Sequence, residues 1–427
     1  MSAATAERVP LFSSFALRNF RLFWIGGFVS NIGTWMARVA QDWLVLTILT
    51  DNSAVALGIV TGLQFLPTLA SPWAGALADR IPKRRLLMYT QAGLALTGTI
   101  LAVLVIGGWI QLWQVYLLAF IQGIAAAVDG PARQAFAPEM VPTKLIGNSV
   151  GLNSTSFHTA RLIGPAVAGL TIAWWGVGPA LAMNAASFIA VGVALFAMNP
   201  AELTPAPRSK TAGGVAEGLR YVRQRPDIML VLFVVFMLGT FGMNFQLTNA
   251  LMATGVFHVG PEEFGYMGSV MAIGSLTAGL IAARRTQVRL RLIVVALAGF
   301  TAVTAVMSLV DGFTVYLALL MLAGFAALTV MTAANTSVQL SVEPAMRGRV
   351  MALYMAIFLG GTPLGSPLLG WVGDAWGPRW TIAIGSIACG VAVVVSVVYL
   401  LRRRGWAWPW RPTPAELAYI AMPDEAR

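Results

Sequence analysis

Long apolar segments alternate with short polar connections along almost the whole chain. An α-helix rises 1.5 Å per residue and the bilayer hydrocarbon is about 30 Å thick, so about twenty apolar residues cross it once. Twelve such segments are present, at residues 20–49, 54–78, 86–107, 112–137, 145–174, 178–197, 228–254, 263–283, 292–310, 313–340, 350–374 and 380–401. The pattern predicts an all-α integral membrane protein with twelve transmembrane helices.

The connections divide these helices into two equal sets. Only one connection is long, and it follows the sixth helix. We therefore expect a six-helix bundle at 1–198, a cytoplasmic linker at 199–227, a second six-helix bundle at 228–402 and a cytoplasmic tail at 403–427. Within the linker, Val215, Leu219 and Val222 share one helical face. This segment is either an amphipathic helix on the cytoplasmic membrane surface or a solvated linker helix.

The composition also indicates a protein embedded in lipid. Of the 427 residues, 58% are hydrophobic and 11% are charged, against roughly 25% charged in soluble domains. The net charge of +11 comes from bases at the N-terminus, at the even-numbered connections and in the tail, whereas the odd-numbered connections contain only Arg379. Because positive residues stay cytoplasmic, both termini are predicted to be cytoplasmic. The charge therefore marks topology rather than nucleic-acid binding.

The sequence contains no pattern typical of an enzyme. One cysteine, Cys389, excludes an intrachain disulfide, and two separated histidines make no metal-ligand cluster. The chain has neither a phosphate-cradling G-x-x-x-x-G-K-[ST] loop nor a G-x-S-x-G elbow. We expect no catalysis, no cofactor and no metal.

Two short motifs recur at matching places in the two halves. Gly164-Pro165-Ala-Val-Ala-Gly169 is followed 201 residues later by Gly365-Ser-Pro-Leu-Leu-Gly370. Gly75-Ala-Leu-Ala-Asp79-Arg80 is followed 204 residues later by Gly279-Leu-Ile-Ala-Ala-Arg284. These offsets indicate a duplicated six-helix unit, as in transporters built from internal repeats.

The motifs resemble those of the major facilitator superfamily. Residues 75–85 are similar to its G-x-L-A-D-R-x-G-R-[KR] signature, with Pro82 in place of the second glycine. Arg161-Leu-Ile-Gly164-Pro165 is similar to the Gly-Pro motif of its antiporters. The segments 129–136, 218–223 and 347–351 resemble the branch of bacterial exporters that includes the enterobactin exporter and macrolide efflux proteins.

The resemblance implies two pseudo-symmetric six-helix bundles around a central cavity, which opens alternately to either side of a bacterial inner membrane. It implies a monomer that exports a small amphipathic organic molecule, such as a drug or siderophore, in exchange for protons. An uptake symporter or uniporter of the same fold, and a membrane receptor that transports nothing, are the alternatives.

Polar side chains at membrane depth are costly, so they are candidates for function. One stripe of the first helix, with the spacing i, i+4, i+7, i+11, falls at a depth similar to that of polar residues on the second, fourth and fifth helices. The seventh helix adds a polar patch from the second bundle. The predicted substrate-binding residues are Asn31, Trp35, Arg38, Gln64, Gln122, His158, Arg161, Asn244, Gln246 and Asn249, and Asp42 is the predicted proton-coupling acid.

Each of these candidates has a structural alternative. For Asp42, burial favours the neutral form and a nearby arginine the ionised form, which suits proton coupling. Alternatively, Asp42 is only the i, i+4 ion-pair partner of Arg38. Arg38 and Arg161 either bind an anionic or hydrogen-bond-accepting substrate or pack against carbonyls and Asp42. The amides of the seventh helix either contact substrate or only join helices.

A charge cluster is expected at the cytoplasmic end of the first bundle. Helix rise places Asp129 there, where it can meet Lys83, Arg84 or Arg133. Asp79 can accept hydrogen bonds at the positive N-terminal end of the eleventh helix. The second half has an alanine at the matching place, so this lock is predicted to be one-sided. By resemblance, the gating residues are Gly75, Asp79, Arg80, Lys83, Arg84, Asp129, Arg133, Gly164 and Pro165.

Overall fold

The computed structural model describes residues 10, 12–70, 81–204, 215–283 and 290–403, and all secondary structure in these ranges is helical. The first half contains α1 (Arg18–Trp43) with a π-helical continuation (Leu44–Leu49), α2 (Ala54–Phe65) with a 3-10 continuation (Leu66–Ala70), α4 (Lys83–Ile106), α5 (Leu112–Phe136), α6 (Ile146–Trp175) and α7 (Val177–Phe196). Short 3-10 helices lie at Ser13–Ala16, Ala137–Met140, Thr143–Leu145 and Pro200–Glu202.

The second half follows the linker helix α8 (Val215–Arg223). It contains α9 (Pro226–Met237), a π-helical turn (Leu238–Gly242), α10 (Phe245–Gly255), α11 (Pro261–Ala283), α12 (Leu290–Met307), α13 (Phe313–Ser341), α14 (Pro344–Gly360), α15 (Thr362–Trp376) and α16 (Pro378–Arg403). Several of these helices begin at a proline, which suits the first turn because its missing N–H has no partner there.

Nine helices in the described ranges are long and apolar enough to cross a membrane. Two of these crossings run through a break, because α9 continues as α10 and α14 continues as α15. The helices α1 and α6 are longer than many of the nine but too polar to be counted among them, and α2 has only a short described part. With these three, each half makes six helical crossings, as predicted.

The internal repeat is visible in the turns as well as in the motifs. Gly176 joins α6 to α7 with φ +84°, and Gly377 joins α15 to α16 with φ +95°. The two glycines are 201 residues apart, the same offset as between the Gly-Pro motif and its counterpart. A side chain is strained at such φ values, so glycine allows both helix pairs to reverse within one residue.

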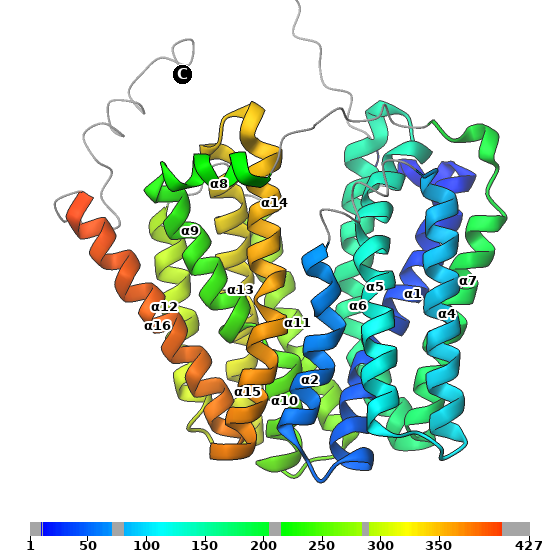
Figure 1. Ribbon diagram of the computed structural model, residues 1–427. Helices are drawn as coiled ribbons and strands as arrows, with labels where there is room; N and C mark the ends of the chain where they lie inside the picture. The colour runs from blue at the N-terminus through cyan, green and yellow to red at the C-terminus, as the bar shows by residue number, and fades with distance from the viewer. Residues whose placement is uncertain (1–9, 11, 71–80, 205–214, 284–289, 404–427) are drawn as a thin grey trace, which may run out of the picture.

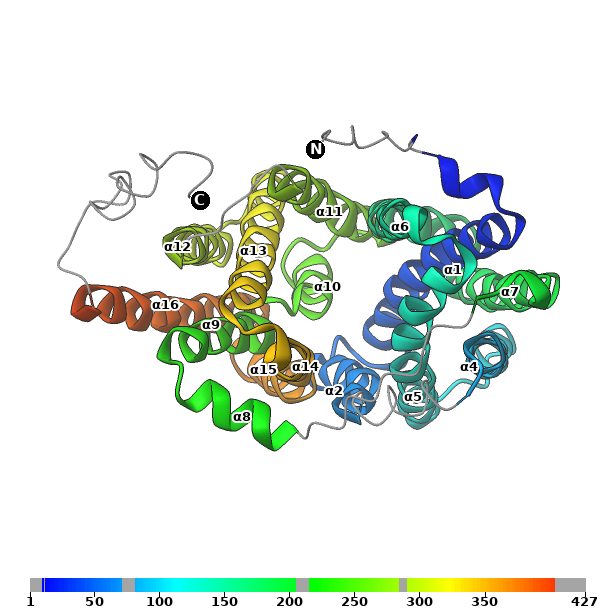
Figure 2. The ribbon, with the colours of Figure 1, turned by 90° about the horizontal axis from the view of Figure 1, so that it is seen from above.

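The two halves stand side by side and share one polarity (Figure 1). The start of α1, the end of α16 and the helix α8 lie at one end of the molecule, which we call the terminal end. The connections at residues 50–53, 107–111 and 308–312 lie at the opposite end, which we call the distal end. Seen along the helices, α2 lies beside α15 and α6 beside α11 (Figure 2).

Small residues bring the two halves into backbone contact along these helix pairs. A Cβ atom added at Gly58 on α2 would lie 2.5 Å from the Ser366 carbonyl oxygen on α15. A Cβ at Gly169 on α6 would lie 2.5 Å from the Pro261 carbonyl oxygen on α11. Such small residues are typical of closely packed membrane helices. Both contacts hold the distal parts of the two halves together.

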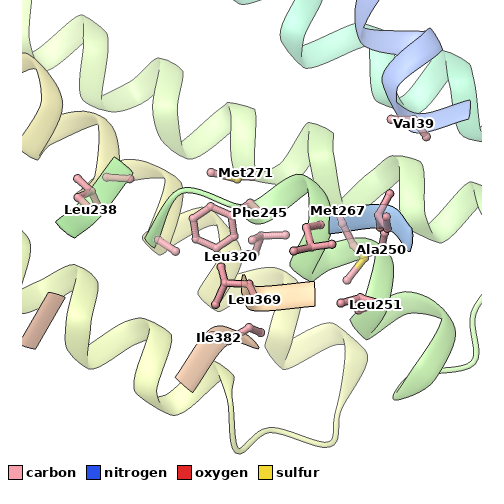
Figure 3. Packing of buried hydrophobic residues seen from close by; sticks show 14 of the residues in the cluster. Val39, Leu238, Phe245, Ala250, Leu251, Met267, Met271, Leu320, Leu369 and Ile382 are labelled. Atoms are coloured by element: carbon pink, nitrogen blue, oxygen red, sulfur yellow. The ribbon is translucent and has the colours of Figure 1, made fainter. Parts of the chain in front are cut away.

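The short helix α10 packs in the core of the second half and also contacts α1 and α2 of the first half (Figure 3). Its apolar side chains pack among residues from α11, α13, α15 and α16, and the cluster includes Phe245, Ala250, Leu251, Met267, Met271, Leu320, Leu369 and Ile382. All of these side chains are buried. This packing holds the start of α10, which carries Gln246, in a defined position.

The linker helix α8 packs on the terminal end of α14. A guanidinium nitrogen of Arg349 lies 3.3 Å from a carboxylate oxygen of Glu217, and Val222 is buried, whereas Leu219 is exposed. The predicted helix is therefore present, and one of its apolar residues packs against the protein.

Candidate functional site

A cavity of about 870 Å³ lies within the first half of the molecule. Its wall is formed by α1, α2, α4, α5, α6 and α7, and Leu359 on α14 is the single described lining residue from the second half. The lining runs from Phe23 near the start of α1 to Gln41, and it reaches Ala137 just after the end of α5. The cavity therefore extends from the terminal end to the middle of the membrane-spanning helices.

An indole ring connects two arginines at the inner part of this site. The guanidinium carbon of Arg38 lies 4.8 Å from the centroid of the Trp35 ring, and that of Arg161 lies 5.3 Å from it. Arg38 also lies 5.4 Å from the Phe65 ring. These cation–π contacts hold both cations without neutralising them. The Nε atom of Arg38 is buried and has no hydrogen-bond partner among the described residues.

Asp42 lies beyond the inner end of the cavity, between the two halves. It is 2% exposed, and it forms no ion pair with Arg38 in this structure. The side chain of Gln246, on α10 of the second half, lies beside the carboxyl group. The Oδ2 atom has no described partner. Asp42 was interpreted either as a proton-coupling acid or as the ion-pair partner of Arg38, and that ion pair is not formed in this conformation.

Asp129 is the centre of a hydrogen-bond cluster at the terminal end of the cavity. Its Oδ1 atom accepts hydrogen bonds from Thr90 Oγ1 and Gln91 Nε2, both at 2.7 Å, and its Oδ2 atom accepts one from Arg133 Nε at 2.5 Å. All four residues belong to the first half. In this conformation the cluster joins helices within one bundle and does not bridge the two.

The basic residues near Asp129 have other partners than expected. Lys83 Nζ lies 3.0 Å from a carboxylate oxygen of Glu139. Arg84 donates to the carbonyl oxygens of Leu195 at 2.7 Å and Phe196 at 3.0 Å. Of the three bases expected to meet Asp129, only Arg133 does so. Lys83 instead pairs with the Glu139 carboxylate, and Arg84 bonds to carbonyl groups at the C-terminus of α7. Both partners are distant in sequence.

The cavity wall is rich in side-chain amides. In the described part of the chain, none of these side chains donates or accepts a hydrogen bond to another residue. They are Asn31, Gln41, Gln64, Gln122, Gln134, Asn153 and Asn184. Gln41 and Asn184 are buried, and the other amides of the wall are partly or fully exposed, so their donors and acceptors are available to a bound molecule.

The structure gathers one part of the predicted substrate-binding set and separates another. Asn31, Arg38, Gln64 and Gln122 line the cavity. Trp35 and Arg161 lie directly behind its wall, and His158 stacks edge-on against the lining residue Phe157 at 5.7 Å. The predicted residues of the first bundle therefore form one site.

The amides predicted from the second half are engaged elsewhere. Asn244 donates to the Thr240 carbonyl at 2.7 Å and accepts from Ser366 Oγ at 2.7 Å. Asn249 accepts from Tyr316 Oη at 2.9 Å. Both side chains join helices of the second half and do not line the cavity in this conformation.

The predicted gating residues are distributed over two regions. Gly75, Asp79 and Arg80 lie outside the described residues. Gly164 packs against α1, because a Cβ there would lie 2.5 Å from the Trp35 Cβ. Pro165 lies against α11 of the other half, where its carbonyl oxygen would be 2.5 Å from a Cβ at Gly265.

One contact between the halves was not anticipated. Asp374, near the end of α15, accepts hydrogen bonds from the backbone N–H groups of Ala54 at 2.6 Å and Val55 at 3.1 Å, and from Ser53 Oγ at 3.1 Å. The carboxylate thus caps the N-terminus of α2, where the helix dipole favours negative charge. The pairing is invisible in the sequence because Asp374 follows Ser53 by 321 positions.

The cavity-lining amides Gln41, Gln134, Asn153 and Asn184 were also missed by the sequence prediction. The signal that could have found Asn153 is the low hydropathy of α6, which has eight serine, threonine, asparagine and histidine side chains in residues 148–159. A helix that polar must face water or protein rather than lipid. Gln41 lies beside Asp42 and does not continue the stripe, so spacing alone excluded it.

Comparisons with known proteins agree with the fold. The family model described as transmembrane secretion effector matches residues 10–407. The staphyloferrin A transporter of Staphylococcus aureus is 26% identical over 388 residues, which are 90% of this chain and 96% of that protein. Macrolide efflux protein A of Streptococcus pyogenes is 23% identical over 400 residues, with the same coverage. The enterobactin exporter EntS of Shigella boydii is 22% identical over 405 residues, 90% of this chain and 93% of that protein.

Solved transporter structures have the same architecture. A bacterial homologue of the human lysosomal transporter Spinster, in an inward-facing and occupied conformation, matches with a TM-score of 0.70 and 16% identity over 95% of this chain and 100% of that chain. The peptide-transporter-family protein PepTSo also matches with a TM-score of 0.70, at 11% identity over 90% of this chain and 98% of that chain. The predicted all-α fold of two six-helix bundles is confirmed.

Proposed function

Because the chain belongs to the transmembrane secretion effector family of the major facilitator superfamily, it is a multi-pass bacterial membrane transporter and not an enzyme, and we propose that it exports a small amphipathic organic molecule in exchange for protons. The observation that carries the proposal is the cavity of about 870 Å³, which reaches from the terminal end to the middle of the helices, whereas the two halves are in close backbone contact in their distal parts. A cavity of this size suits one small organic molecule.

The charge distribution supports a cytoplasmic position for the terminal end. Lys83, Arg84, Arg133 and Arg349 lie at the ends of helices on that side, whereas Arg379 is a distal base that pairs with Asp311. By the positive-inside rule, the terminal end faces the cytoplasm. The conformation is then inward-open, and the cavity takes up its substrate from the cytoplasm.

The names of the relatives favour export over uptake. Macrolide efflux protein A and the enterobactin exporter both carry names that state outward transport. The family description, transmembrane secretion effector, points the same way. We extend this direction to the present chain.

Asp42 is the residue that we propose for proton coupling. It lies beside Gln246 at the boundary between the halves, so separation of the distal ends would expose it to the outer side. Burial of an ionised carboxyl group with one unpartnered oxygen is costly, and protonation removes that cost. We propose that a proton taken from outside accompanies the return of the empty carrier to the inward-open state.

Flux measurements in proteoliposomes test the proposal. The purified protein is reconstituted with a panel of siderophores and macrolides, and substrate and proton movements are followed under an imposed pH gradient. Opposite movement of substrate and protons supports antiport, parallel movement would show symport, and a receptor would move neither. Asp42→Asn should abolish acceleration by the gradient while substrate exchange continues. Asp311→Asn, which removes an exposed distal carboxylate, is the matched control.

A further inference from the structure

The charged groups of the cavity wall are unbalanced. Arg38 and Arg133 are the described basic residues in the lining, and Asp129 is the described acidic one. The carboxylate of Asp129 already accepts hydrogen bonds from Thr90, Gln91 and Arg133. No described carboxylate in the wall therefore remains for a positively charged guest, whereas both guanidinium groups face the cavity.

Asp129 positions Arg133, and the Nη groups of Arg133 remain available as hydrogen-bond donors. Its Nε atom bonds to Asp129, and its Nη groups make no hydrogen bond to a described residue. The Nη1 atom would lie 3.5 Å from a Cβ at Gly27, so the absence of a side chain there leaves room for the guanidinium group beside α1. Asp129 is thus a positioning residue, and the outer N–H groups of Arg133 remain available for a planar acidic group.

The two arginines lie far apart along the cavity. Arg133 is level with Gly27, and Gly27 precedes Arg38 by eleven residues on the same helix. At 1.5 Å per residue, this separation corresponds to roughly 16 Å of helix rise. Asn31 lies between these two levels on α1, and its amide, with the other amides of the wall, can donate to oxygen atoms of a bound molecule.

We infer that the cavity binds an oxygen-rich organic polyanion that has an acidic group near each end, one held by Arg38 and the other by Arg133. The inference rests on the proposed function, because it takes this cavity as the transport site. A lipophilic cation would meet two guanidinium groups and, among the described lining residues, no free carboxylate, and this like-charge juxtaposition disfavours it. Of the drug and siderophore classes, the geometry points to acidic, siderophore-like molecules.

Equilibrium binding to the purified full-length chain in lipid nanodiscs tests the inference without requiring transport. The probes are α,ω-dicarboxylates of increasing length, the matching diamines, the matching monocarboxylates and tetraphenylphosphonium. Dicarboxylates long enough to reach both arginines should bind more tightly than short dicarboxylates or monocarboxylates. The diamines and tetraphenylphosphonium should bind most weakly.

Substitutions of Arg38 and Arg133 test which arginine holds each end of the bound molecule. Arg38→Gln should weaken all carboxylates by about tenfold to a hundredfold, as expected for a charge-assisted hydrogen bond. Arg133→Gln should weaken only the long dicarboxylates by a similar factor, and Arg133→Lys should restore part of the loss. Asp129→Asn should reduce the length preference by releasing Arg133. Arg21→Gln removes an exposed positive charge from the same helix outside the cavity and is the control, which should leave affinity unchanged.

The outcomes separate this inference from the proposed function. If the long dicarboxylates bind with this dependence but no flux follows a pH gradient, the substrate class stands and proton-coupled export fails. If cations bind more tightly than dicarboxylates, if no dicarboxylate binds, or if both arginine variants bind long dicarboxylates as the parent does, the inference is overturned. Thermal unfolding of each variant in nanodiscs identifies any loss that comes from misfolding.

Discussion

The cap that Asp374 places on α2 should control which side of the transporter is open. The carboxylate belongs to the second half and accepts hydrogen bonds from Ser53, Ala54 and Val55 of the first half. These bonds exist only while the distal ends of the two halves are together. Asp374→Ala should therefore destabilise the inward-open state relative to the outward-open state without affecting contacts within either half.

The expected size of the effect follows from the capping geometry. Loss of a helix N-cap costs about 1 kcal/mol, and loss of a negative charge at a helix N-terminus costs about 0.3–1 kcal/mol. Asp374 is exposed, and Ser53 Oγ still accepts from the Ala56 N–H at 3.2 Å, so part of the cap remains. A total of about 1–2 kcal/mol changes the ratio of the two states by roughly fivefold to thirtyfold.

Distances between spin labels at the distal end measure this ratio. Cys389 is the only cysteine and is buried, so a Cys389→Ala background leaves two introduced cysteines as the sole label sites. Trp109 and Leu309 are exposed positions on distal connections of opposite halves and suit the labels. Asp374→Ala should enlarge the long-distance population, and Asp374→Asn, which keeps an acceptor but not the charge, should do so less.

The control for this prediction is an acidic residue at the same end. Asp311 pairs with Arg379 within the second half and does not bridge the halves, so Asp311→Ala should leave the distance distribution unchanged. An unchanged distribution in Asp374→Ala would refute the capping argument. A shift of equal size in Asp311→Ala would show that negative charge at the distal end, rather than the cap, sets the equilibrium.

Three further predictions follow from close contacts. Gly169→Val should push α6 away from the Pro261 carbonyl and enlarge the same long-distance population, and a distribution like that of the parent would contradict the contact. Trp35→Ala should weaken carboxylate binding in nanodiscs more than Arg161→Lys does, because it removes the ring against which both cations pack; equal losses would argue against this role. Gly377→Ala should lower stability by about 1–2 kcal/mol, seen as earlier thermal unfolding, because φ is +95° there.

The crossings were predictable from the sequence, and their internal breaks were not. Bilayer thickness imposes a minimum length on every apolar segment, so counting apolar residues found the crossings. The π-helical turns at Leu44–Leu49 and Leu238–Gly242, and the break between α14 and α15, leave the apolar run uninterrupted. Hydropathy does not report such changes in the backbone, because it depends on side chains alone.

Residue spacing placed side chains on a common face but did not identify their partners. The stripe from Asn31 to Arg38 does reach the cavity, because helical periodicity is a local property. Asp42 on the same stripe makes no ion pair with Arg38 and lies beside Gln246, since the docking of α10 brings an amide from the other half. Partners such as Asp374 and the α2 N-terminus depend on how the two bundles meet, which no local pattern encodes.

The two halves contribute unequally to the cavity wall, and this has a consequence for how such a protein diversifies. The motifs of the two halves recur at matching places, yet almost all of the described cavity wall comes from the first half. The side chains that would contact a bound molecule therefore lie on other helices than the side chains that form the second half. Substitutions on the cavity-facing sides of α1, α5 and α6 can change the accepted molecule while the helices of the second half retain their packing.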